Sequence, residues 1–171
     1  FMVSSGLIEN TDVSHYRLAL HLSLALTILS IIFWFIMETI KISPFKLKFN
    51  NSFLNLFFIL IVLQIILGAL LAGMDGGLIY NSWPDMNGNF LPNDINNIDL
   101  FLYSSLDNPS VVQFYHRFTA YLLFISLLFL NFYTYRAKID FKPVLILNIA
   151  IFVQIVLGIV TLITGVKITY A

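Results

Sequence analysis

Four long apolar windows constrain this chain more than any other feature of its sequence. They cover residues 16–37, 52–73, 114–135 and 143–165, and each holds the roughly 20 apolar residues that a helix needs to cross a bilayer. Hydrophobic residues make up 59% of the chain and charged residues 11%, whereas soluble domains average about 45–50% and about 25%. Because four such windows rarely coexist in one soluble domain, the sequence predicts an all-α integral membrane protein with four transmembrane helices in this chain.

Helices are the expected form of these windows, since backbone polar groups within lipid must find their hydrogen-bond partners inside the segment. Polar residues stand where helix caps are needed: Asp12 or Ser14 for the first window, Ser52 for the second and Ser110 for the third. Pro143 suits the first turn of the fourth helix, where its missing N–H costs nothing. Each window therefore has a start signal as well as sufficient length.

Several classes of function are excluded by composition. The chain has no cysteine, which rules out disulfides, thiolate metal sites and cysteine nucleophiles. It has no basic run of the kind that binds nucleic acid. Its apolar composition instead predicts membrane lipid as its surroundings. The opening FMVSSGL lacks the basic region and cleavage site of a signal peptide and is typical of the end of an apolar segment. We therefore expect a fragment of a longer chain.

Charge placement predicts how the helices are oriented. The two short linkers are basic, whereas the long linker over residues 74–112 has no Lys or Arg and carries five aspartates. By the positive-inside rule, the short linkers face the cytoplasm or matrix, and the long linker and both chain ends face the outer side. This pattern fits a bacterial inner membrane or a mitochondrial inner membrane.

A short internal repeat connects the second and fourth windows. The segment Gln64-Ile-Ile-Leu-Gly68 returns as Gln154-Ile-Val-Leu-Gly158, and each copy lies in a helix that follows a histidine-bearing helix. Two helices per unit give both copies the same orientation, with a pseudo-symmetry axis along the membrane normal. Alternatively, the glutamines form hydrogen bonds between helices and the glycines allow close packing.

Two histidines within the windows are the main candidates for chemistry, because ionisable residues inside membranes are costly and usually functional. His21 and His116 lie at similar depth near the outer side, each with an arginine close by, Arg17 and Arg117. Without a nearby cysteine or carboxylate cluster, such an imidazole suits an axial position on haem iron better than zinc or a hard cation. The arginines suit the haem propionates, which are carboxylates.

Simpler interpretations of these residues remain open. A membrane histidine can serve only as a hydrogen-bonding residue between helices, and Arg17 can extend to lipid headgroups. His15 falls at the water boundary, where an interfacial or capping role is expected.

The segment over residues 67–92, LGALLAGMDGGLIYNSWPDMNGNFLP, carries the chain from an apolar helix into water. We interpret it as a lid and lining above the histidines, with Asp75, Tyr80, Asn81 and Trp83 as candidate substrate contacts. Tyr80 and Trp83 can also be ordinary interfacial anchors, and Asp75 can be merely solvated. Further along, the amphipathic patch over residues 95–106 is expected to form a short interfacial helix.

These motifs resemble the haem A synthase family. The AGMDGGLIYNSWPDMNG core resembles the loop after the first helix of that family's second half, and VVQFYHRFTAY (111–121) is similar to the family's next His-Arg helix. YRLALHLSLA (16–25) is similar to the last helix of its first half, and QIVLGIVTL (154–162) to the helix after the His-Arg helix. The resemblance covers nearly the whole chain.

The resemblance implies an eight-helix protein of two pseudo-symmetric four-helix bundles, each holding a haem between two histidines. Residues 1–51 would then end the first half-bundle, and residues 52–171 would form most of the second. His116 would be an axial ligand of the haem b cofactor, and His21 a ligand of the substrate, haem O. The C8 methyl group of haem O would be oxidised to a formyl group.

The chain also departs from the family pattern. The partner histidines of His21 and His116, and a carboxylate of the family's first outer loop, are missing from residues 1–171. As it stands, the fragment is therefore expected to be inactive alone. The resemblance implies haem O synthase and oxidase assembly factors as partners, and a homo-oligomer is also compatible with it.

Two other function classes were compared with this one. A b-type cytochrome subunit that carries electrons between two haems fits the histidine helices, but it does not need the long outer loop. A transporter half built on parallel repeats is disfavoured, because the windows hold no acidic residue at mid-membrane and no broken helix. Pigment extraction, which measures haem A against haem O, separates the enzyme from the cytochrome.

Overall fold

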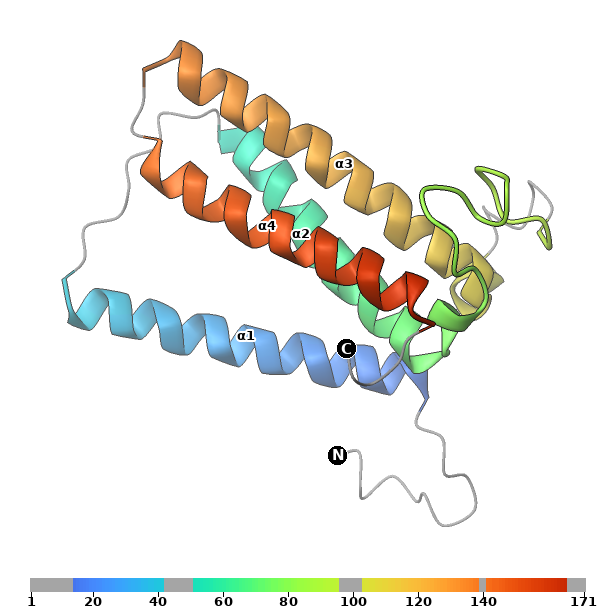
Figure 1. Ribbon diagram of the computed structural model, residues 1–171. Helices are drawn as coiled ribbons and strands as arrows, with labels where there is room; N and C mark the ends of the chain where they lie inside the picture. The colour runs from blue at the N-terminus through green and yellow to red at the C-terminus, as the bar shows by residue number, and fades with distance from the viewer. Residues whose placement is uncertain (1–13, 42–50, 96–102, 139–140, 166–171) are drawn as a thin grey trace.

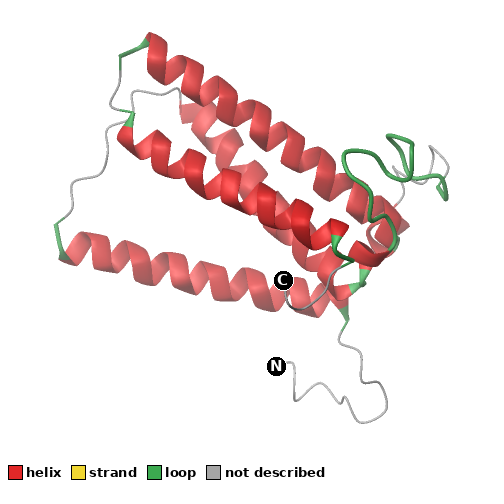
Figure 2. Ribbon diagram, in the orientation of Figure 1, coloured by secondary structure: helices red, strands yellow, loops and turns green. Residues whose placement is uncertain are grey.

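Helices account for most of the described chain. The computed structural model describes residues 14–41, 51–95, 103–138 and 141–165, and in that part the long helices are α1 (His15–Thr39), α2 (Asn51–Gly73), α3 (Pro109–Arg136) and α4 (Lys142–Ile163) (Figure 1). All four are long and apolar enough to span a membrane. Two short 3-10 helices, η2 (Gly76–Leu78) and η4 (Tyr103–Asp107), lie in the linker between α2 and α3, and no strand occurs in the described ranges (Figure 2). The all-α membrane prediction is confirmed.

The helix ends refine the sequence expectations. α3 begins at Pro109, five residues before the predicted window, and its N-cap is Asn108, whose side-chain oxygen accepts from the backbone N–H of Ser110 at 2.9 Å. The expectation that Ser110 caps this helix was wrong, because its hydroxyl donates instead to Asp94 at 2.6 Å. Pro143 does lie in the first turn of α4. Asp12 lies outside the described residues.

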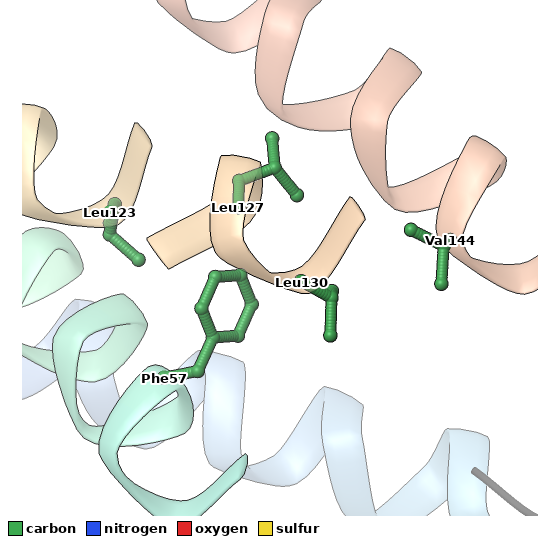
Figure 3. Packing of buried hydrophobic residues seen from close by; sticks show 5 residues of the cluster. All are labelled: Phe57, Leu123, Leu127, Leu130 and Val144. Carbon is green, nitrogen blue, oxygen red and sulfur yellow. The ribbon is translucent and has the colours of Figure 1, made fainter. Parts of the chain in front are cut away.

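The helix α2 holds the described helices together. It packs against both α1 and α3, and α4 packs against α3. One buried cluster joins three helices: Phe57 of α2, Leu123, Leu127 and Leu130 of α3, and Val144 of α4 (Figure 3). Figure 3 shows the Phe57 ring pointing from α2 toward the leucines of α3. Lipid tails are as apolar as leucine, so this contact is stabilised by close packing rather than by removal from water.

A polar clamp inside the α3–α4 contact was not foreseen from the sequence. Asn131 donates to the side-chain oxygen of Asn148 at 2.8 Å, and Asn148 donates back to that of Asn131 at 2.7 Å. Such reciprocal amide pairs satisfy polar groups that lipid cannot satisfy. The pair therefore fixes how α4 is aligned along α3.

The helix α1 is much less integrated than the other three. Ala19 is its only buried residue, and its C-terminal end stands apart from the other helices in Figure 1. Its N-terminal end approaches α2 closely, since a Cβ atom on Gly73 would come within 2.8 Å of the His15 Cα atom. The first turn of α1 also reaches η4, where the Tyr16 hydroxyl donates to Asp107 at 2.8 Å. Thus α1 is attached at the end that carries His21.

Candidate functional site

His116 lies in a slot between α2 and α3. It is the eighth residue of α3, and the side-chain amide of Gln64 in α2 lies 3.1 Å from its Nε2 atom. One helical turn further along α2, a Cβ atom on Gly68 would stand only 3.1 Å from His116 Cε1. The imidazole therefore fits against bare backbone at residue 68, and the Gln-x-x-x-Gly motif of α2 is the wall of the slot.

The slot leaves one imidazole nitrogen without a protein partner. His116 Nδ1 is buried and makes no hydrogen bond. The side-chain oxygen of Gln64 is likewise buried and without a hydrogen-bond partner. A histidine that binds a metal usually has one ring nitrogen held by a neighbouring group and the other directed to the metal. No group of three or more His, Cys, Asp or Glu side chains gathers in the described part of the chain, so an isolated imidazole of this kind suits haem iron. The residues present can therefore supply one haem ligand, through the Nδ1 atom of His116.

Arg117 ties the outer loop to the helix that carries His116. Its guanidinium donates to the backbone oxygens of Ser82 at 2.9 Å, Asp85 at 2.7 Å and Tyr80 at 2.8 Å. Its Nε atom is buried without a partner. Because the neighbouring residue in sequence is His116, the loop conformation is coupled directly to the histidine helix. The predicted propionate contact of Arg117 stays a prediction, and the loop clamp is an additional role.

The ring of Tyr80 anchors the loop from below. Tyr80 is only 5% exposed. Its hydroxyl donates a hydrogen bond to Asp94 at 2.7 Å and accepts one from the Asn93 backbone N–H at 3.0 Å. Burial, followed by the hydrogen bond to Asp94, raises the pKa of Tyr80 above its usual value. Burial alone would raise the pKa of Asp94, but hydrogen bonds from Ser110 and Tyr80 outweigh it and lower that pKa.

The other predicted loop residues occupy different surroundings. The Asn81 amide donates to the backbone oxygens of Gly77 at 2.7 Å and Leu162 at 3.0 Å, which links the loop to the end of α4. Trp83 is 46% exposed. Asp75 is exposed and adopts a left-handed backbone conformation, with φ of 52°. The loop thus leaves an indole and a carboxylate accessible, whereas Tyr80 and Asn81 hold the loop in place.

His21 lies about as far from the start of its helix as His116 does, but in a different environment. It is the seventh residue of α1, and both His21 and Arg17 are exposed. The helices that carry the two histidines both pack on α2, and one buried cluster joins Ala19 of α1 and Val112 of α3 to residues of α2. His15 lies 3.3 Å from Asp107 without hydrogen-bond geometry, at the junction of α1 and η4.

The patch predicted over residues 95–106 is only partly described. Its end belongs to η4 (Tyr103–Asp107), and residues 96–102 lie outside the described residues. A cavity of about 320 Å³ opens between α3 and α4 and is lined by apolar side chains and Asn148. It lies about two turns or more beyond His116 along α3, and none of the predicted site residues lines it.

Comparison with known proteins identifies the family. All of residues 1–171 match the family model of COX15-CtaA, described as cytochrome oxidase assembly protein. The chain belongs to this family. The haem A synthase of Pelagibacter ubique is 59% identical over the whole chain, which covers 51% of that relative. The haem A synthases of Wolbachia pipientis wMel and Rickettsia canadensis are 37% and 39% identical, and the chain covers 49% and 52% of them. The chain thus spans about half the length of the curated relatives it matches, and no solved structure matches it.

Three residues of the site were not identified from the sequence. Gln113 is 1% exposed, and its amide donates to the Tyr80 backbone oxygen at 2.9 Å. Asp94 and Ser110 complete the hydrogen bonds around the Tyr80 hydroxyl. Gln113 stands four residues before Arg117, a spacing that places both side chains on one face of the helix. That spacing was the available signal for a shared target, whereas nothing in the sequence linked Asp94 to Ser110.

Proposed function

We propose that residues 1–171 form part of a haem A synthase that oxidises the C8 methyl group of haem O to a formyl group. The observation that carries the proposal is the His116 slot, an imidazole held on one nitrogen and left without a partner on the other. Curated relatives that match the whole chain bear the name haem A synthase, which supports the same activity. In this proposal residues 1–51 end one half-bundle and residues 52–171 form most of the other.

The proposed roles divide between the two histidine helices. His116 holds the resident haem b, which supplies electron transfer when it is bound, and Arg117 orients the loop and faces the propionate edge. His21 and Arg17 hold the substrate haem O. The loop over residues 74–108 covers the outer end of both sites, with Tyr80 and Asn81 fixing its base and Asp75 and Trp83 at its accessible surface. In the charge-based orientation, this loop faces the outer side of an inner membrane.

The proposed partners follow from the substrate. Haem O must come from an enzyme of the haem O synthase class, and haem A must pass to factors that assemble terminal oxidases. A homo-oligomer in lipid remains part of the proposal. None of these partners requires contact with nucleic acid.

A hybrid protein provides the test. Residues 1–171 replace the aligned half of the Pelagibacter ubique relative, and the hybrid is expressed in bacteria that make haem O but no haem A. Extracted haems are separated and quantified, with the unaltered relative as the positive control and the empty vector as the negative one. We expect haem A to appear and haem O to fall. A hybrid that reaches the membrane and binds haem, yet leaves haem O unchanged, would contradict the proposal and favour an electron-carrying b-type cytochrome.

A further inference from the structure

The side chain of Gln64 has an unusual position for a polar residue in a membrane helix. Its amide lies 3.1 Å from His116 Nε2, and its oxygen is buried without a hydrogen-bond partner. Leaving a buried acceptor unsatisfied costs about 1–3 kcal/mol, more than an apolar side chain of the same shape would cost. Helix packing alone therefore does not explain a glutamine at this position.

The contact with His116 explains it better. An amide offers a donor and an acceptor, and a half-turn of the side chain exchanges them, so Gln64 can hold either neutral form of the imidazole. On the same face of α2, Gly68 limits where the ring can move, because His116 Cε1 lies 3.1 Å from the position of a Cβ atom there. Gln64 thus fixes the hydrogen bond of the ring, and Gly68 restricts the positions that the ring can occupy.

We propose that Gln64 is a positioning residue for His116, which sets the rotation and tautomer in which the imidazole is presented to haem iron. The inference rests on the proposed role of His116 as a haem ligand. Groups that hold the second nitrogen of a ligating histidine typically contribute about 10- to 100-fold to metal affinity. Gln64 acts through His116 and needs no contact with haem.

The test uses the hybrid protein, purified with its haem. Gln64→Leu removes the amide, and Gln64→Glu keeps an oxygen at the same reach. Asn55→Leu is the matched control, because Asn55 is an exposed amide on the same helix. Haem release to excess apomyoglobin measures retention, and electron paramagnetic resonance and the midpoint potential report the state of the ligated iron.

We expect the Gln64→Leu hybrid to release haem on the order of 10- to 100-fold more readily, with a shifted midpoint potential and a broadened low-spin signal. Gln64→Glu should restore retention, and Asn55→Leu should match the unaltered hybrid. If Gln64→Leu does not accumulate in membranes, Gln64→Met supplies the same test, because it removes the amide and keeps an unbranched side chain of similar length.

Outcomes for this inference differ from those for the proposed function. A Gln64→Leu hybrid with the retention, signal and potential of the Asn55→Leu control overturns the positioning role, even if haem A is made. If the Gln64→Leu substitution alters the iron signals but the unaltered hybrid makes no haem A, the positioning role is upheld and the proposed function is rejected. A hybrid that inserts in the membrane without any haem overturns both.

Discussion

The helices α3 and α1 each carry a histidine and an arginine near their start, yet among the described residues only the histidine of α3 has polar and packing partners built around it. His116 is held by the amide of Gln64 and packed against Gly68, and the neighbouring Arg117 binds three backbone oxygens of the outer loop. His21 and its arginine are exposed on a helix whose only buried residue is Ala19.

This difference shows that the histidine motif does not make a site by itself. The site arises where a Gln-x-x-x-Gly face on a second helix receives the imidazole. The other copy of that face, in α4, illustrates the unfilled form, since Gly158 has no atom of another group within 4 Å in the described part of the chain. Of the two copies of the repeat, only the copy in α2 receives a histidine within the described residues.

The largest expected effect is that of His116→Ala in the hybrid protein. The substitution removes the imidazole from the slot between α2 and α3, so we expect the haem b spectrum of the purified protein to fall at least about 100-fold per protein, more than loss of a supporting group would cause. Haem A should disappear from extracted pigments. Reduced-minus-oxidised spectra measure the first effect. A hybrid with an unchanged spectrum would show that His116 does not hold the resident haem.

His21→Ala should separate the two histidines. Because His21 is exposed on α1 whereas His116 contacts Gln64 of α2, we expect the resident haem spectrum to persist while conversion of haem O falls to background. The measurement combines the spectrum of the purified hybrid with pigment extraction from the same cells. Loss of both signals together would mean that the two histidines serve one haem, contrary to the assignment of separate sites.

Much of the fold follows from local sequence because the membrane imposes length and apolarity on each helix. The predicted windows correspond to α1, α2, α3 and α4, and Pro143 marks the start of α4 as expected. The cap of α3 was missed, since Asn108 and Ser110 are both good capping residues and the choice depends on Asp94, which is distant in sequence. The Asn131–Asn148 pair was missed for a similar reason, because it depends on the register of two helices.

The site divides in the same way. His116 was identified from its type and depth, which are local properties, and the two readings of Gln64, packing or chemistry, were left open. What the sequence could not indicate is the direction of each side chain. Arg117 reaches loop carbonyls and Tyr80 turns inward to Asp94, and both depend on how a Gly- and Asn-rich loop closes over α3.

Arg117→Ala tests the loop clamp that distinguishes α3 from α1. The change leaves the carbonyls of Tyr80, Ser82 and Asp85 without the guanidinium, and a charged hydrogen-bonding group of this kind contributes at least about 2 kcal/mol. We expect roughly 30-fold more frequent opening of the loop, measured as hydrogen exchange of its amides. Arg136→Ala is the control, because Arg136 is exposed at the far end of α3. Equal hydrogen exchange in both variants would show that Arg117 does not hold the loop closed.

The smallest effect concerns pH and the Tyr80–Asp94 contact. The pKa of Asp94 is lowered in the folded loop, so its stabilisation is complete above the unfolded value of about 3.9 and is lost as pH falls through the lower folded value. The pKa of Tyr80 is raised, so its contribution is complete below about pH 10 and is lost as pH rises through the higher folded value.

Fluorescence of Trp83 in a Trp34→Phe background follows loop opening at both limits. Because Asp94 is exposed, solvent screening keeps the acid effect small. Asp94→Asn should abolish it, whereas Asp75→Asn, an exposed change in the same loop, should leave it unaltered; an acid transition that survives in Asp94→Asn would assign the effect to another carboxylate.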